Sequence, residues 1–139
     1  MSVNIAVEVE KKVKAIDKEM KHRSAKATRA LKNAELRVMR GARGGASYSK
    51  PFRRSSYTAS APGEPPAVRT GNLRNSLMSS VETEDNGFLS LTVKTKTDVH
   101  YAGYLEHGTS KMAARPYVDK IKKEALPELK TIYGAAYNV

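Results

Sequence analysis

Cysteine is absent from the 139-residue sequence, and histidine occurs only three times. Without cysteine the chain forms neither a disulfide nor a thiolate zinc site, so its stability depends on packing and on partners. A run of about 18 apolar residues that could span a bilayer is also lacking, and the N-terminal residues do not have the basic-then-apolar order of a secretory signal. We therefore expect a soluble protein that is made in the cytosol and makes no membrane contact.

Acidic residues are scarce in the first half of the chain. Residues 1–60 contain 15 Lys and Arg but only 5 Asp and Glu, whereas residues 61–139 contain 10 and 9, for a net charge of +11. The length fits a single domain. The asymmetry predicts that the first half contacts an anionic partner, either nucleic acid or an acidic protein surface. A solvated helix face is the alternative.

Proline and glycine are missing between Ile5 and Arg40, and we predict that residues 1–40 form one long basic helix. Apolar or small residues recur there in steps of three and four and trace one narrow stripe: Val9, Val13, Ile16, Met20, Ser24, Ala27, Leu31, Ala34 and Val38. Such a helix would be about 50 Å long, which exceeds the width of a domain this size. It must kink, project or lie against a neighbouring subunit. We favour oligomerisation; the alternative is a helix that breaks near its middle and folds back.

Residues 41–69 are rich in glycine, proline, serine and arginine and show no periodicity of helix or strand. We predict an extended loop or arm, in which Gly41 ends the first helix. Basic residues alternate there with Tyr48, Phe52 and Tyr57, a mixture that can follow a nucleic-acid backbone or anchor the arm to a partner protein. We favour a protein partner. The residues that we predict to contact DNA or a partner are Lys11, Lys12, Lys14, Lys18, Lys21, Arg43, Arg53 and Arg54.

Residues 70–139 have the pattern of a small α+β core. A short helix follows Thr70, whose hydroxyl can cap it. Alternating apolar residues predict two strands, 77–83 and 88–97, around a turn at 84–87 that contains an Asn-Gly pair.

The last third of the chain is expected to cover this hairpin. Residues 101–105 form an apolar strand or turn that ends in a loop at 106–110. A final helix begins at Arg115-Pro116, and Pro127 should kink it or end it near Leu126. The predicted fold is therefore α+β: a long N-terminal helix, an extended loop, a small antiparallel β-sheet with a hairpin, and a C-terminal helix packed on the sheet.

Residues that carry chemistry are sparse. His22, His100 and His107 share no metal-ligand spacing, and the glycines at 41–45 follow a helix where a phosphate-binding loop would follow a strand. Glu106 and His107 could be an acid and a base beside Thr109 and Ser110, but adjacent residues do not make a triad, and we interpret them as a structural turn. We predict no catalytic residue, no cofactor and no metal. Sequence-specific nucleic-acid recognition is not expected, whereas non-specific contact with DNA stays open.

Several short motifs in the second half resemble those of a known family. In chain order they are Gly63-Glu64-Pro65-Pro66, Arg69-Thr70-Gly71-Asn72-Leu73-Arg74-Asn75-Ser76-Leu77, Tyr101-Ala102, Leu105-Glu106-His107-Gly108-Thr109-Ser110, Lys111-Met112 and Ala114-Arg115-Pro116-Tyr117. This order and spacing resemble the phage head-tail joining or tail-completion proteins, also called neck or minor tail-component proteins. The resemblance spans residues 63–129, and His107 stands where that family more often has Phe or Tyr. The N-terminal helix matches only in kind.

The resemblance implies a structural virion protein of a long-tailed phage or prophage, not an enzyme. It implies a ring, with six copies expected, at the neck or the head-proximal tail end, assembled in the host cytoplasm. The implied partners are copies of the chain, the head connector or closure protein, the tail tube protein and double-stranded DNA in the lumen.

A ring requires two different patches on each subunit, one meeting the other on the next copy. We predict that the hairpin and the loop at 106–112 lie at these contacts, through Leu77, Phe88, Leu91, Val93, Glu106, His107, Gly108, Thr109, Ser110 and Met112. The main rival is a non-specific double-stranded DNA-binding protein that acts alone. A small hydrolase that uses His107 is a third hypothesis.

Overall fold

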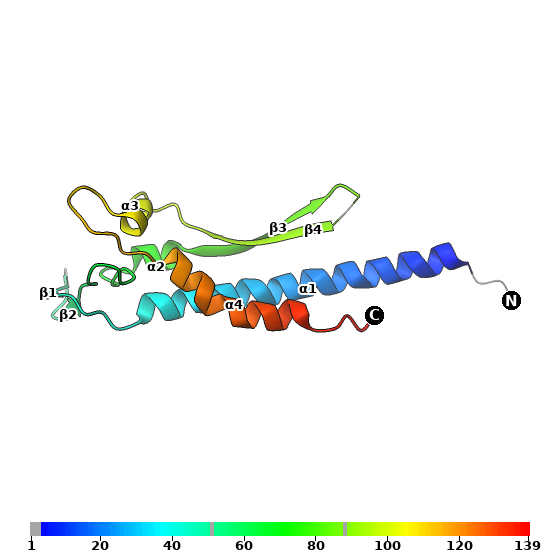
Figure 1. The fold of residues 1–139 in the computed structure, drawn as a ribbon, viewed down its shortest axis with the longest axis horizontal. Coiled ribbons are helices and arrows are strands. Elements are labelled where there is room, and N and C mark those ends of the chain that lie inside the picture. Colours follow the sequence, from blue (N-terminus) through cyan, green and yellow to red (C-terminus); the bar gives the residue numbers. More distant parts are fainter. Residues whose placement is uncertain (1–3, 51, 88) are drawn as a thin grey trace.

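The computed structural model describes residues 4–50, 52–87 and 89–139, and its longest element is one uninterrupted helix. This helix, α1 (Ile5–Arg40), contains 36 residues, and Asn4 caps it by accepting a hydrogen bond from the Val7 N–H at 3.4 Å. Figure 1 shows α1 running along an elongated molecule, with its first turns extending past the other elements. Of the arrangements expected for so long a helix, projection is the one observed, and the alternative of a helix that breaks and folds back is wrong.

The predicted hairpin is present as β3 (Met78–Asp85) and β4 (Leu89–Lys96), which pair antiparallel with Val81 opposite Val93. Gly87 adopts a φ of +84° in the turn, a conformation that glycine permits without strain. Half-buried Leu89, Leu91 and Val93 alternate with exposed Ser90 and Thr92, as expected for a sheet with one covered face. Phe88, which we had placed at the start of the second strand, lies outside the described residues. The hairpin runs beside α1 (Figure 1).

The segment 41–69, predicted as an extended loop or arm, includes two short strands that the sequence pattern did not predict. They form a second hairpin, β1 (Ser47–Ser49) and β2 (Ser56–Thr58), in which Tyr48 faces Tyr57 with ring centroids 6.0 Å apart. Strands of three residues are too short to produce a visible alternation of apolar and polar positions. The pairing is set instead by cross-strand contacts that the sequence pattern does not reveal.

Two short helices flank the long hairpin. The predicted helix after Thr70 is α2 (Asn72–Ser76); the Thr70 hydroxyl accepts a hydrogen bond from the Asn72 N–H at 3.4 Å, although Gly71, with φ of +89°, occupies the cap position. The predicted strand or turn at 101–105 is wrong, because α3 (Ala102–His107) is helical. Tyr101 and Leu105 are four residues apart, which places both on one helical face.

The C-terminal helix, α4 (Val118–Gly134), begins later than predicted, with Tyr117 as its cap residue. Pro127 lies inside the helix and does not end it. In Figure 1 the axis of α4 changes direction partway along, as expected where a proline removes one helical hydrogen bond. Packing of α4 against α1 continues on both sides of this position, through buried Ala125 and half-buried Leu129, which accounts for the helix continuing.

The core lies where α1, α4, the long hairpin and the two short helices meet. Ala27, Ala34 and Ala125 are completely buried, and such small side chains allow two helices to approach closely. Larger buried side chains, among them Leu73, Leu77, Tyr117 and Ile121, fill the space next to them. The α+β fold with a C-terminal helix packed on the sheet is confirmed. None of the described helices combines the length and the hydrophobicity needed to cross a bilayer.

Candidate functional site

The segments that carry the motifs meet at the end of the molecule where α2 and α3 lie (Figure 1). The Gly63 N–H donates to the Ala114 carbonyl at 3.0 Å, and the Arg115 N–H donates to the Leu105 carbonyl at 2.7 Å. The Arg115 guanidinium also donates to the Ser60 hydroxyl at 2.9 Å and to the Ser60 carbonyl. The motif residues thus connect three separate segments of chain to one another.

The Gly-Thr-Ser loop is a tight turn held by backbone hydrogen bonds. Gly108 has a φ of +76°, and a Cβ atom there would lie 2.8 Å from the Ala114 nitrogen, so only glycine fits. The Thr109 N–H donates to the Met112 carbonyl at 2.8 Å, and the Thr109 hydroxyl accepts from the Lys111 N–H at 3.3 Å. His107, Thr109 and Ser110 are exposed and Met112 is half-buried. The loop is built as a scaffold, with exposed side chains on its outer surface.

Glu106 points into the molecule and caps α4. Its Oε2 atom accepts hydrogen bonds from the backbone N–H groups of Tyr117, at 2.8 Å, and Val118, at 3.2 Å. A carboxylate at this position also interacts favourably with the helix dipole. Burial of the Tyr117 phenol, and secondarily the charge of Glu106, raises the pKa of Tyr117. The Glu106 carboxylate is thus engaged in capping, beside the exposed His107 with which we had considered an acid–base pair.

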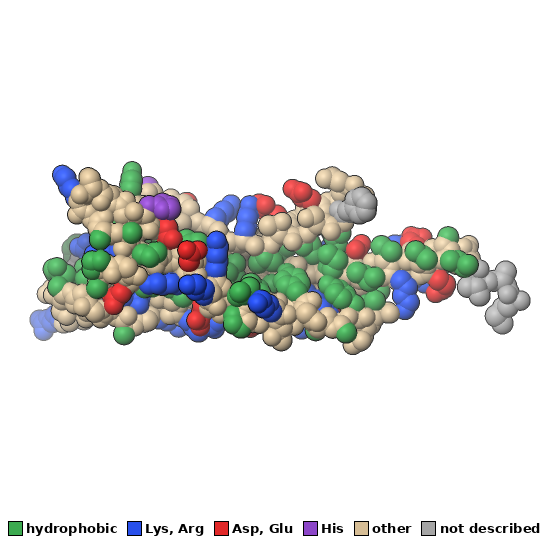
Figure 2. Space-filling view, in the orientation of Figure 1, with side chains coloured by type: hydrophobic (Ala, Val, Ile, Leu, Met, Phe, Trp, Pro, Cys, Tyr) green, Lys and Arg blue, Asp and Glu red, His purple; other side chains and the backbone are tan. Residues whose placement is uncertain are grey.

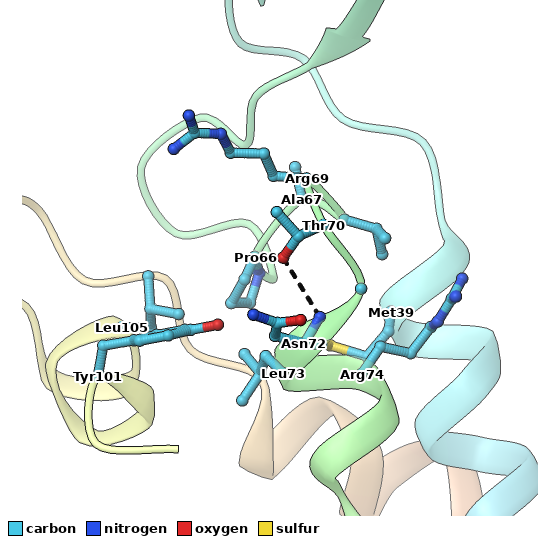
Figure 3. A pocket seen from close by; sticks show the side chains of 12 residues that line it. Met39, Pro66, Ala67, Arg69, Thr70, Asn72, Leu73, Arg74, Tyr101 and Leu105 are labelled. Atoms are coloured by element: carbon cyan, nitrogen blue, oxygen red, sulfur yellow. Dashed lines mark hydrogen bonds between the residues drawn. The ribbon is translucent and has the colours of Figure 1, made fainter. Parts of the chain in front are cut away.

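An apolar pocket of about 430 Å³ lies between α2, α3 and the C-terminal end of α1. Figure 3 shows Met39, Pro66, Leu73, Tyr101 and Leu105 around it, with the Thr70–Asn72 hydrogen bond at one edge. The charged side chains that the described residues contribute to its lining are arginines, with no carboxylate or imidazole among them. Within the described part of the chain, no group of three His, Cys, Asp or Glu side chains could hold a metal ion. The pocket can bind an apolar group, but these residues supply no acid–base pair.

Arg43, predicted to contact DNA or a partner, instead folds back onto the C-terminal end of α1, the helix that precedes it. Its guanidinium donates to the carbonyls of Val38 at 2.8 Å, Gly41 at 2.7 Å and Pro66 at 3.2 Å, and so satisfies the C-terminal end of α1. Burial lowers the pKa of Arg43, while the nearby Glu64 charge opposes that shift. Gly41, with φ of −58°, does not adopt the left-handed conformation of a glycine cap. The arginine side chain takes over that role.

The remaining predicted basic residues are exposed but form two separate groups. Five of them lie in the N-terminal half of α1: Lys11, Lys12, Lys14, Lys18 and Lys21. Arg53 and Arg54 lie in the turn between β1 and β2, next to Phe52, which is fully exposed and has a φ of +60°. Figure 1 places the two groups at opposite ends of the molecule, so they do not form one binding site.

The first half of α1 carries an apolar stripe that the described residues do not cover. We call it the uncovered stripe; it comprises Ile5, Val9, Val13 and Ile16, whose exposed fractions are 73%, 56%, 50% and 37%. The same face farther along the helix contains buried Ser24, Ala27 and Ala34. The uncovered stripe therefore continues a face that is packed against α4 and the hairpin elsewhere.

A second apolar surface is an open groove between β4 and α4, floored by α1 and about 950 Å³ in volume, which we call the β4–α4 groove. Figure 2 shows hydrophobic side chains filling this region of the surface. Three predicted interface residues, Leu77, Leu91 and Val93, line it, together with Ile121, Leu126 and Leu129 of the other wall. The predicted contacts at 106–112 do not take part in the groove.

Two buried charged residues were not singled out from the sequence. Glu35 is 1% exposed and accepts a hydrogen bond from the Ser79 hydroxyl at 2.8 Å and another from the Thr95 hydroxyl, which joins both long strands to α1. Arg23 is 5% exposed and donates to the carbonyls of Ala135 and Ala136 after α4. Their helical positions beside the apolar stripe are the one signal in the sequence that could have identified them.

Comparison with known proteins gives one match. Residues 5–108 match the family described as "Bacteriophage HK97-gp10, putative tail-component". No curated protein and no solved structure matches the chain. The match includes α1 as well as most of the motifs in the second half, and it stops before α4.

Proposed function

The chain belongs to the HK97-gp10-like family of bacteriophage tail components, and from this premise we propose that it is a structural virion protein that forms a ring in a long-tailed phage or prophage. The ring joins the head connector to the tail or completes the end of the tail tube. Six copies are expected, at the neck or head-proximal tail end, with DNA passing through the lumen.

The observation that carries the proposal, beside family membership, is apolar surface that is left exposed by the described part of the chain. The uncovered stripe and the β4–α4 groove expose large aliphatic side chains on two different parts of one subunit. Contiguous exposed apolar surface commonly marks protein–protein contacts. Two different patches on each subunit are what a closed ring requires.

The proposed role is structural and not enzymatic, and the motif residues favour it. Gly108, Glu106 and Arg115 hold turns, cap a helix and join segments, which are tasks of a scaffold. The exposed loop they support presents His107, Thr109 and Ser110 outward, where they can meet another subunit, the head connector or closure protein, or the tail tube protein.

Removal of the protein from a phage tests the proposal. Particles made without it should include full heads beside detached tails if the ring joins the two parts, and tails of uncontrolled length if it completes the tube. The purified protein should have a native mass of several copies. Normal infectious particles without the protein, together with a monomeric native mass, would contradict the proposal.

Contact with DNA is a second candidate function, because the turn between β1 and β2 presents exposed Phe52, Arg53 and Arg54 together. Basic and aromatic side chains at an exposed tip can contact phosphates and stack on bases. A monomer that binds duplex DNA tightly, with a steep salt dependence, and never forms rings would favour this function over the ring. Charge reversal at Lys11, Lys12, Lys14 and Lys18 tests the other basic region: unchanged DNA retention and head attachment would rule out that role for α1.

A further inference from the structure

We propose that the uncovered stripe of α1 in one copy of the chain lies in the β4–α4 groove of another copy. The proposal rests on the proposed function, in which copies of the chain assemble with one another, and adds which two surfaces meet. It makes use of the hairpin part of the predicted interface and of the apolar face of α1, whereas the predicted contacts of this segment were its lysines.

The first argument is continuity. On α1 the uncovered stripe lies on the same helical face as Ser24, Ala27 and Ala34, which the chain's own α4 and hairpin bury. The face is therefore already adapted to pack between a helix and a strand. Its first three turns or so, from Ile5 to Ile16, are left exposed by the described residues, so a second copy can supply the same kind of surface.

The second argument is size. From Ile5 to Ile16 a helix rises about 16 Å. The β4 side of the groove, from Leu91 to Thr97, extends about 20 Å at the rise of a strand. The groove is thus long enough to hold the whole uncovered stripe and has aliphatic walls on both sides.

The third argument is charge. At about 100° per residue, acidic residues border the uncovered stripe on both sides, whereas most lysines of this segment occupy the opposite face and only Lys12 lies near the stripe. The bordering acids are Glu8, Glu10, Asp17 and Glu19. Figure 2 shows acidic and hydrophobic side chains, together with some basic ones, on this projecting end.

The groove has the complementary charge. All charged side chains that the described residues contribute to its lining are lysines, two on β4 and two on α4: Lys94, Lys96, Lys122 and Lys123. Several of these charges also have ion pairs within the chain: Glu8, Glu10 and Glu19 on the stripe side and Lys94 and Lys122 on the groove side. The complementarity between the two surfaces is therefore carried mainly by Asp17 on the stripe and by Lys96 and Lys123 on the groove. Such complementarity selects the partner and its orientation more than it adds affinity.

The absence of cysteine allows a direct test by cross-linking. Val13→Cys on the stripe and Leu126→Cys on the groove wall are made as separate full-length proteins and treated with a short bis-maleimide, alone and mixed. We expect covalent dimers in the mixture and monomers from each variant alone. Dimers from Val13→Cys alone would mean that two α1 helices pair with each other, and would overturn the proposal.

The double variant Val13→Cys/Leu126→Cys separates this proposal from the ring. A ladder of products that ends at one closed size supports both the docking and the ring. A covalent dimer and nothing larger supports the docking and contradicts the ring. A native mass of several copies with no cross-link from stripe to groove overturns the docking and leaves the proposed function intact.

Charge exchange provides a second test that does not depend on reactive groups. Asp17→Lys should weaken self-association several-fold, and Lys123→Glu in the same chain should restore part of it. Arg29→Glu, at an exposed position on the opposite face of the same helix, is the matched control and should leave self-association unchanged. A loss with Asp17→Lys together with a gain of similar size with Arg29→Glu would show that net charge alone controls assembly, and would count against the proposed contact.

Discussion

The two halves of α1 have the same apolar periodicity but different surroundings. In the second half, Ala27 and Ala34 are completely buried, and buried Arg23 and Glu35 tie the helix to α4 and to the long hairpin. In the first half, Val9 and Val13 remain about half exposed, and side-chain bonds of the described residues, such as Lys11 to Glu8, stay within the helix. Periodicity identifies a face that will be covered. It does not identify whether the same chain or another one covers it.

The largest effect is expected from placing the same charge on each half of the stripe. Ala27→Asp buries a carboxylate without a partner and should lower the free energy of unfolding by about 4 kcal/mol or more. Val9→Asp places the same side chain on the exposed half and should change the free energy of unfolding of the monomer by no more than about 0.5 kcal/mol. Urea denaturation at low protein concentration measures both. If the two variants lost similar free energy of unfolding, the two halves of the stripe would not differ in how they are buried.

Truncation of Glu35 should have the next largest effect. Glu35→Ala leaves the Ser79 and Thr95 hydroxyls without their buried acceptor and should cost about 2–3 kcal/mol. Glu10→Ala is the control on the uncovered half, where Glu10 only pairs with Lys14 at the surface, and it should cost at most about 0.5 kcal/mol. If Glu35→Ala were as mild as Glu10→Ala, the hairpin would not depend on this anchor.

Arg23 is expected to act more locally. It donates to the carbonyls of Ala135, at 2.5 Å, and Ala136, at 2.7 Å, and its guanidinium lies 3.9 Å from the Tyr137 ring centroid. Arg23→Ala should cost about 1–2 kcal/mol and speed amide hydrogen exchange at the C-terminal end of α4. Arg29→Ala, at an exposed position of the same helix, should do neither. If amide exchange in Arg23→Ala were unchanged, Arg23 would not stabilise the C-terminal end of α4.

Much of the fold follows from local signals in the sequence. The absence of proline and glycine predicted the full extent of α1, and the Asn-Gly turn predicted the β3–β4 hairpin to within a few residues. These signals succeed because helix continuity and turn geometry depend on neighbouring residues. The start of α4 was misplaced because Glu106, eleven residues before Tyr117, supplies its cap. Pro127 was expected to kink or end α4; it does not end the helix, because packing against α1 continues on both sides of it.

The surfaces could be predicted only in part. The stripe on α1 and the hairpin residues Leu77, Leu91 and Val93 were identified, because helix and strand periods show which side chains share a face. The β4–α4 groove could not be, since it exists only where two distant segments lie side by side. Arg43 shows a different limit of sequence analysis. The basic composition of its segment suggested that Arg43 contacts a partner, whereas in the fold its guanidinium donates to the Val38 carbonyl of α1.

The smallest effect concerns Glu19, at the boundary between the two halves. Its carboxylate accepts a hydrogen bond from Arg23 Nε at 2.8 Å, and this bond, more than any other contact, lowers the pKa of Glu19. A lowered folded-state pKa means that the ion pair stabilises the protein above the ordinary glutamate value of about 4.3 and loses that contribution as the pH falls through the lower folded value. The thermal midpoints of the wild-type chain and Glu19→Gln should therefore differ slightly at neutral pH and converge in acid. In an Arg23→Ala background the substitution should have no effect at any pH, and a difference that persisted there would show that Glu19 acts through another partner.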